Sequence, residues 1–483
     1  MNFRCGALLL ALTMSSCTCA PRPLTVARTT LAKLPDDVRK GSLAIDEDQR
    51  DVAFAQQTPD GVRLVHRGVA GPPYSDIAQP RLAPGTDAVF YWAMNQTGGE
   101  GVRDIFLIAN EQPIPIVPPI ARPMKIVFTP SGSRWAVIAG TEPGPDGQPP
   151  STVRAWVDGQ FAGEYPDMSQ PTFSSDGTHV AVLVDAGGGR IGLLVDGKQE
   201  RVFDTPARPA VPRIQPHAIG PNMPEQFSIS YLVSGELLIL TSDRDGWSVY
   251  RGERRLASYP GNEWQPSDGP RMDFGGVLAA APSIAAASLT AASAAPVVAW
   301  WARDGGADGR WRVVRDSAPE SPTCARPGDA PALSTDGRHL AYACYEKPAG
   351  EIGKVSVIHD GHTYGPYDAV WSVAISPDGR HVAFAADGGA EQSAWFYVVD
   401  GKRYRLQFDQ AFPPRFSPDG RHVAWVAKHL RSDGRPAKYL LFVDGSSVAS
   451  SDEVVTGPRF ADDGALSWVA LRGKRLSRIE AKR

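Results

Sequence analysis

The stretch SPDGRHVAF at residues 376–384 decides the fold, because close copies of it recur along the chain. The copies are SPDGRHVAW at 417–425, STDGRHLAY at 334–342 and SSDGTHVAV at 174–182. Equivalent glycines lie 42, 41 and 44 residues apart, at Gly337, Gly379, Gly420 and Gly464. A period of this size indicates an array of similar units.

A second glycine turn follows the first within each well-preserved unit. These turns are Asp158-Gly159, Asp196-Gly197, Asp360-Gly361, Asp400-Gly401 and Asp444-Gly445. Asp-Gly between apolar runs is a strong hairpin signal, because glycine adopts the positive φ that a type I′ turn requires. The runs beside the turns, such as 381–386 and 395–399, are apolar on both faces, as in sheets packed between other sheets. The unit is therefore predicted to be a four-stranded antiparallel meander, and an array of such units predicts an all-β β-propeller.

These turns resemble the PD-type repeats of TolB-like propellers, which are related in architecture to WD-repeat proteins. The resemblance is strongest over 333–469 and good over 124–200. The WD dipeptide is missing, and the N-terminal α/β domain of TolB has no counterpart here. The resemblance implies a propeller scaffold and does not specify a ligand.

We predict eight to ten four-stranded blades within 43–483, with an irregular, insertion-bearing region at 205–330. Weaker copies of the unit lie at 44–54, 83–85, 128–132, 233–235 and 266–269. After Gly464 the chain can form only two more strands, and 24–30 is predicted to supply the missing strand and close a single ring. Closure would remove exposed sheet edges. The alternative is two propellers divided near the proline-rich 205–225.

The N-terminus resembles a bacterial lipoprotein signal. Residues 1–16 combine Arg4 with a short apolar run and small residues, directly before Cys17. We expect lipidation at Cys17, a linker over 17–42, and export to the periplasm or outer membrane of a Gram-negative bacterium. Thr18 after the cysteine resembles outer-membrane sorting. The alternatives are an ordinary secretory signal cut nearby, or Cys19 as the modified residue.

Charge and cysteine content limit the partners and the redox state. The formal net charge is −3, so there is no electrostatic case for nucleic acid, and we expect membrane contact only through the lipid anchor. Cys324 and Cys344 are the two cysteines of the body. In an oxidising compartment they are expected either to form a disulfide or to remain two separate buried thiols.

Histidines are the main candidates for a metal site, but their spacing argues against one. Four of them open the same strand in different blades, at His179, His339, His381 and His422. His359 and His362 flank a two-residue turn and lie opposite each other, so they form a weak candidate metal pair. Because no further ligand is identifiable, an exposed pair is the alternative, and we predict no cofactor.

Function is expected to lie on the face that carries the turns between the second and third strands of each blade, which vary in length and sequence. These are 140–151, 185–190, 346–353, 387–393 and 428–438. Divergent loops on a rigid frame favour a protein-binding, or glycan-binding, scaffold. The alternative is a propeller hydrolase or lyase acting on a carbohydrate or peptide at the central funnel, marked by inward carboxylates with perturbed pKa values. No Gly-x-Ser-x-Gly elbow occurs, so no catalytic residue is assigned. A purely structural spacer is the third possibility.

Replacing Cys17 with alanine is expected to release the protein from membranes into the soluble fraction. Acyl chains contribute about 0.8 kcal/mol per buried CH₂, so loss of the anchor removes the membrane affinity. Fractionation and the intact mass of the mature N-terminus measure this, with Cys19→Ala as the matched control. An unmodified mature terminus beyond Cys17 would contradict lipidation.

Overall fold

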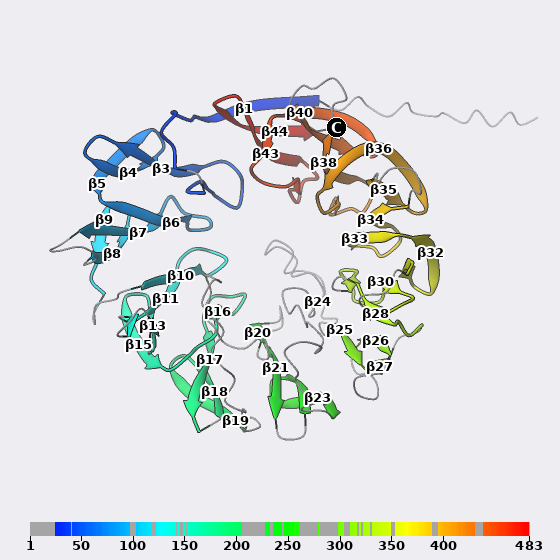
Figure 1. Ribbon diagram of the computed structural model, residues 1–483, viewed down its shortest axis with the longest axis horizontal. Coiled ribbons are helices and arrows are strands. Elements are labelled where there is room, and N and C mark those ends of the chain that lie inside the picture. Colours follow the sequence, from blue (N-terminus) through cyan, green and yellow to red (C-terminus); the bar gives the residue numbers. More distant parts are fainter. Residues whose placement is uncertain are drawn as a thin grey trace, which may run out of the picture.

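The computed structural model describes β-strands joined by turns (Figure 1). The described residues are 25–39, 41–96, 103–116, 122–141, 143–144, 148–150, 152–188, 190–204, 228–231, 235–243, 246–260, 279–280, 298–303, 310–315, 318–319, 322–328, 331–348, 353–388, 395–429 and 438–482. Within these ranges no helix is long and apolar enough to span a membrane.

The described strands form ten antiparallel blades arranged side by side in one ring (Figure 1). Blade one contains β2 (Ala44–Ile45), β3 (Val52–Thr58), β4 (Gly61–His66) and β5 (Val69–Tyr74). Blade two contains β6 (Asp76–Leu82), β7 (Val89–Gln96), β8 (Arg103–Ala109) and β9 (Gln112–Ile114). Blade three contains β10 (Arg122–Phe128), β11 (Trp135–Gly140), β14 (Val153–Val157) and β15 (Gln160–Tyr165). Blade four contains β16 (Thr172–Phe173), β17 (Val180–Gly187), β18 (Arg190–Val195) and β19 (Lys198–Asp204). Blade five contains β20 (Ser228–Tyr231), β21 (Leu237–Asp243), β22 (Gly246–Arg251) and β23 (Arg254–Pro260). Blade six contains β24 (Ala279–Ala280), β25 (Val298–Arg303), β26 (Trp311–Arg315) and β27 (Ala318–Pro319).

The remaining blades complete the ring. Blade seven contains β28 (Arg326–Pro327), β29 (Ala332–Leu333), β30 (Leu340–Tyr345), β31 (Val355–His359) and β32 (His362–Tyr367). Blade eight contains β33 (Ala369–Ile375), β34 (Val382–Asp387), β35 (Trp395–Val399) and β36 (Lys402–Ala411). Blade nine contains β37 (Arg415–Phe416), β38 (Val423–His429), β39 (Lys438–Val443) and β40 (Ser446–Ser451). Blade ten contains β41 (Glu453–Val454), β42 (Arg459–Phe460), β43 (Leu466–Arg472), β44 (Arg475–Lys482) and β1 (Thr25–Lys33). A small hairpin of β12 (Pro143–Gly144) and β13 (Gln148–Pro150) lies between β11 and β14.

The hydrophobic core is divided into clusters that lie between neighbouring blades. In β34, Phe384 packs toward blade seven, whereas Ala383 and Ala385 pack toward blade nine. Alternate residues of a strand point to opposite faces, and both faces are covered here. This confirms the sequence-based reading of runs that are apolar on both faces.

The Asp-Gly turns have the backbone geometry that the sequence predicts. In blade nine, Asp444 has φ of 49° and Gly445 has φ of 83°, so both central residues are left-handed as in a type I′ turn. The Ser-x-Asp-Gly turns join the first and second strands, and the Asp-Gly turns join the third and fourth. Both turns therefore lie on one face of the ring, here called the turn face.

Glycine is needed in some of these turns because the preceding blade approaches closely. A Cβ atom on Gly445 would lie 2.1 Å from Cε1 of Tyr404, a ring that packs against Trp425. Gly361 has a similar φ of 81°, but a Cβ there would meet nothing within 4 Å. Both glycines therefore need a positive φ, whereas only Gly445 is also constrained by close packing against the preceding blade.

The two ends of the described chain meet in blade ten. The blue strand β1 lies beside the red strand β44 in Figure 1, and they pair antiparallel from Thr25↔Lys482 to Lys33↔Arg475. The chain therefore forms one ring, the preferred sequence-based alternative, and the blade number is at the upper end of the expected range. The proline-rich 205–225, the turn at 266–269 and most of the alanine-rich 278–295 lie outside the described residues.

Replacing Gly445 with alanine is expected to destabilise the ring more than replacing Gly361 with alanine. Both variants place a side chain at positive φ, at about 1–2 kcal/mol, but only Gly445→Ala also overpacks against Tyr404, adding about 1–3 kcal/mol. Thermal unfolding of the two purified variants compares them directly. Equal losses would show that the close approach to Tyr404 contributes nothing.

Candidate functional site

A histidine and an aspartate join the two turns of each regular blade on the turn face. In blade nine, His422 Nδ1–H donates to Asp444 Oδ2 at 2.8 Å, and Asp444 Oδ1 accepts the Val423 N–H at 3.0 Å. Ser417 Oγ accepts the His422 N–H at 2.9 Å and donates to Asp419 at 2.5 Å. The same pair recurs as His179–Asp196, His339–Asp360 and His381–Asp400. These histidines have a structural role, as their spacing predicts.

Blade three keeps the bridge between its turns but uses an arginine. The N–H of Thr129 donates to the carbonyl of Arg134, as Ser417 does to His422, so Arg134 occupies the histidine position. Its Nε donates to Asp158 Oδ2 at 2.8 Å. A cation thus faces a carboxylate at the same place.

Blade one reverses the charges of this bridge. The N–H of Asp46 donates to the carbonyl of Asp51, which puts Asp51 at the histidine position. Arg67, with φ of 50° before Gly68, stands where the other blades carry aspartate. Arg67 Nε donates to Asp51 Oδ2 at 2.8 Å, and His66 Nε2 lies 2.9 Å from the same oxygen. The sequence signal for Asp51 and Arg67 is their position in the repeat, and it is found only when the turns of blade one are aligned with those of the other blades.

The reversal extends the bridge to the next blade, because Arg67 also pairs with Asp87 of blade two. The hydrogen bonds to Asp87 and Asp51 raise the pKa of Arg67, and the guanidinium lowers the pKa of Asp87. Both groups are therefore charged throughout the physiological range. The pair links blades one and two at the turn face.

The seam between blades ten and one is closed by apolar packing as well as by strand pairing. Leu34 follows β1 and packs with Val52, Phe54 and Val65 of blade one and with Leu476 of β44. Its N–H donates to the carbonyl of Lys474 at 2.7 Å. The inner end of the seam is bonded too, because Gln49 Nε2 donates to the carbonyl of Gly457 at 3.2 Å.

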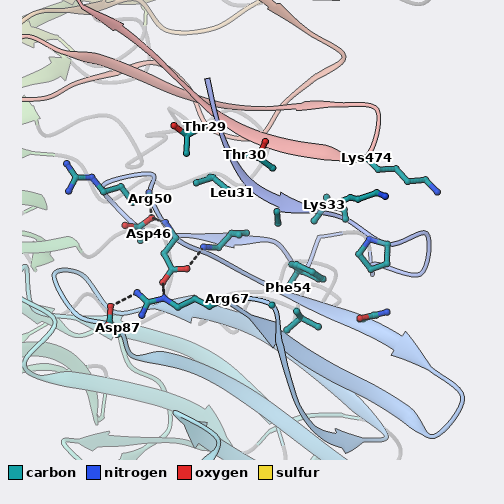
Figure 2. Close-up of a pocket in the computed structure, with 18 of the residues that line it drawn as sticks. Thr29, Thr30, Leu31, Lys33, Asp46, Arg50, Phe54, Arg67, Asp87 and Lys474 are labelled. Carbon is teal, nitrogen blue, oxygen red and sulfur yellow. Dashed lines mark hydrogen bonds and ion pairs between the residues drawn. The ribbon is translucent and has the colours of Figure 1, made fainter. Parts of the chain in front are cut away.

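A groove of about 1170 Å³ lies at this seam and is the candidate functional site, here called the seam groove (Figure 2). One wall is β1 from Thr29 to Lys33, and the floor comes from the apolar residues of blade one. At the turn face the lining comes from Asp46, Asp48, Arg50, Asp51, Arg67, Gly68 and Gly85–Asp87, and at the opposite end it comes from Pro35, Asp36, Gln56 and Lys474, which lies in the β43–β44 turn. Three blades therefore contribute to one concave surface.

The rim of the seam groove carries charges of both signs above the apolar floor. Lys33, Asp48 and Arg50 are exposed, and Figure 2 shows Arg50 and Lys474 at opposite ends of the view. Phe54, on the floor, is 5% exposed. This arrangement accommodates a ligand that is partly apolar and partly charged.

The seam groove runs from the turn face to the opposite, loop-bearing face, where Lys474 of the β43–β44 turn lines it. The expectation of a site among the turns that join second and third strands stays a prediction. Much of that face, including 389–393 and 430–437, lies outside the described residues. Its described part includes the β12–β13 hairpin, which lengthens the second turn of blade three.

The candidate metal pair is not the exposed pair that the sequence suggested. His359 and His362 are opposite each other in the β31–β32 register, but His359 is buried and its Nε2–H donates to the carbonyl of Gly379 in blade eight at 2.8 Å. The reason is packing between blades, which covers this side of β31. Among the described residues, no group of three or more His, Cys, Asp or Glu side chains is placed to hold a metal ion.

Cys324 and Cys344 form a disulfide with their Cα atoms 5.3 Å apart. Cys324 exchanges backbone hydrogen bonds with Trp311 of blade six, and Cys344 lies in β30 of blade seven. The bridge therefore ties the connection between these blades to the second strand of blade seven. Cys17 lies outside the described residues.

Carboxyl groups with shifted pKa values are all shifted downward in the described part of the chain. They cap turns or pair with basic groups, and they are Asp60, Asp87, Glu164, Asp176, Asp196, Asp336, Asp378, Asp419, Asp452 and Asp463. In Asp419, for example, the Ser417 hydroxyl is the largest cause. Such carboxylates stabilise turns in the charged form.

No protein-family model matches the chain, and no curated protein matches it. Solved structures resemble it at low identity. The C-terminal WD40 domain of Sif2 is 10% identical, with 94% of this chain and 98% of that chain covered and a TM-score of 0.34. The β-propeller domain of the Trilobed protease from Pyrococcus furiosus is 11% identical over 77% and 94%, with a TM-score of 0.30. The Dos1 propeller is 10% identical over 74% and 93%, with a TM-score of 0.34. These likenesses concern the propeller fold alone.

The pKa of His179 is expected to lie above its ordinary value and to fall in Asp196→Asn. The hydrogen bond to Asp196 raises the pKa, so the pair stabilises the fold below the ordinary histidine pKa and loses this effect as pH rises through the raised value. The effect on stability is small because the side chain is 57% exposed. Histidine NMR titration measures the shift, with Asp185→Asn in the same blade as control. An unchanged His179 pKa in Asp196→Asn would contradict the bridge.

Proposed function

We propose that this protein is a lipid-anchored scaffold of the bacterial cell envelope that binds another envelope protein in the seam groove. It is tethered through Cys17 in the periplasm or at the outer membrane. The TolB-like character of its repeats supports a role in binding. The observation that carries the proposal is the combination of an apolar floor and a rim of mixed charge on a rigid, closed ring.

The size and chemistry of the seam groove favour a polypeptide ligand. Its volume of about 1170 Å³ exceeds the roughly 300–1,000 Å³ of typical small-molecule sites. Apolar residues such as Phe54 and Val52 suit buried side chains, while Lys33, Asp48 and Arg50 suit a charged periphery. This division into an apolar centre and a polar rim is typical of protein interfaces.

The position of the groove favours a partner that is also held at the membrane. Seven residues lie between Cys17 and Thr25, the first residue of β1, so the Cα atoms of these two residues are eight steps apart along the chain. An extended chain of that length spans at most roughly 28 Å. An anchor at Cys17 would therefore hold β1, which forms a wall of the groove, close to the bilayer surface.

A photo-crosslinking residue in place of Arg50 is expected to capture one envelope protein in intact cells. The same residue in place of Arg254, an exposed position on β23, is the matched control and is expected to capture none. Mass spectrometry of the adducts identifies the partner, and Cys17→Ala is expected to reduce the yield. Equal adducts at both positions would contradict the seam groove as the site, and carbohydrate adducts alone would indicate a glycan-binding scaffold instead.

A further inference from the structure

A second cavity, of about 820 Å³, lies along the inner strands of blades one to four and is here called the channel cavity. Its lining comes from β2, β6, β10 and β16 and the residues beside them. Figure 1 shows β6, β10 and β16 on the side of their blades that faces the ring centre. It shares no lining residue with the seam groove.

The channel cavity is lined by two cations that lack an acidic partner. Arg81 is exposed and Lys125 is half-buried, and neither side chain makes an ion pair or hydrogen bond with other described residues. Glu47 is the one carboxylate among the lining residues, and it is exposed. The lining is therefore net positive in a protein whose net charge is −3.

The strand position of Arg81 also carries arginine in blades nine and ten. Arg81 forms the last-but-one pair between the inner strand and the second strand of its blade, with Phe90 as its partner. Arg415 and Arg459 occupy the same position, with Ala424 and Ser467 as their partners. Arg459 donates to the carbonyl of Glu47, and Arg415 is exposed. Blades nine, ten and two thus present guanidinium groups from equivalent positions.

Two glutamines complete the polar lining of the channel cavity. Gln79 precedes Pro80 within β6 of blade two, and Gln170 precedes Pro171 just before β16 of blade four. Gln79 has φ of 49° and lies in a bulge between Ala78 and Arg81. Ser372 in blade eight has the same left-handed backbone, so the bulge is part of the architecture. Bulges of this kind re-aim side chains beside binding sites.

We propose that the channel cavity binds an acidic, extended polypeptide segment. Guanidinium and ammonium groups pair with carboxylates, and the planar fork of arginine favours bidentate contacts. A glutamine amide both donates and accepts hydrogen bonds, which matches the N–H and C=O groups of an extended backbone. Phe128, Phe173 and the prolines of the lining supply apolar surface between these polar groups. The proposal is independent of the partner proposed for the seam groove.

Fluorescence anisotropy with a labelled oligoglutamate peptide tests the proposal on the full-length chain. We expect the wild-type protein to bind this peptide and not a serine–glycine peptide of equal length. The double variant Arg81→Gln/Lys125→Gln is expected to weaken binding at least about tenfold, because two charge-assisted contacts are lost. Thermal unfolding midpoints are expected to stay nearly unchanged, because Arg81 is exposed and Lys125 is only half-buried.

The matched control is Lys198→Gln/Arg254→Gln, which removes two exposed cations from outer strands. Retained binding in this control supports the channel cavity as the site. Equal weakening in both double variants would show non-specific attraction and overturn the proposal. Tighter binding of an oligouronate than of oligoglutamate would overturn it in favour of an acidic glycan. Unchanged binding in Arg81→Gln/Lys125→Gln would also overturn it.

Discussion

The regular blades depend on one carboxylate that spans two turns. Asp444, in the Asp-Gly turn, holds the start of the second strand through Val423 and the Ser-x-Asp-Gly turn through His422. Its left-handed backbone is tolerable for aspartate and lets Gly445 approach Tyr404 of the preceding blade. The same short segment therefore sets strand pairing within a blade and packing between blades. Because neighbouring blades cover each other's apolar faces, the core exists only when these turns are in place.

The seam shows how this constraint is met where the repeat has diverged. Blade one retains a bridge between its turns, but Asp51 and Arg67 have exchanged the charge of the usual pair. Arg67, which stands at the aspartate position, also reaches Asp87 of the next blade. Ring closure and an unusual electrostatic environment thus coincide at one place. The seam groove lies at this place.

The sequence predicted the fold well because the repeated turns have strict backbone requirements. Asp444-Gly445 specifies a type I′ turn locally, and its period along the chain specifies the blades. The site was less predictable, because it depends on contacts between residues far apart in the sequence. The burial of His359 by blade eight and the meeting of Leu34 with Leu476 have no local signal. Arg67 was overlooked because the other blades carry an aspartate at its position, so the repeat pattern does not single it out.

The pairing of β1 with β44 has a consequence for how the protein is made. Strand β1 precedes every other described strand in the order of synthesis, and its partner comes last. During synthesis, β1 therefore has no β44 to pair with until the last described strand has been made. Such a non-local contact closes late in folding, since the entropy of joining distant segments must be overcome first. Blade ten can therefore be completed only after all the other described strands have been made, so its β1–β44 pair distinguishes a finished ring from an unfinished one.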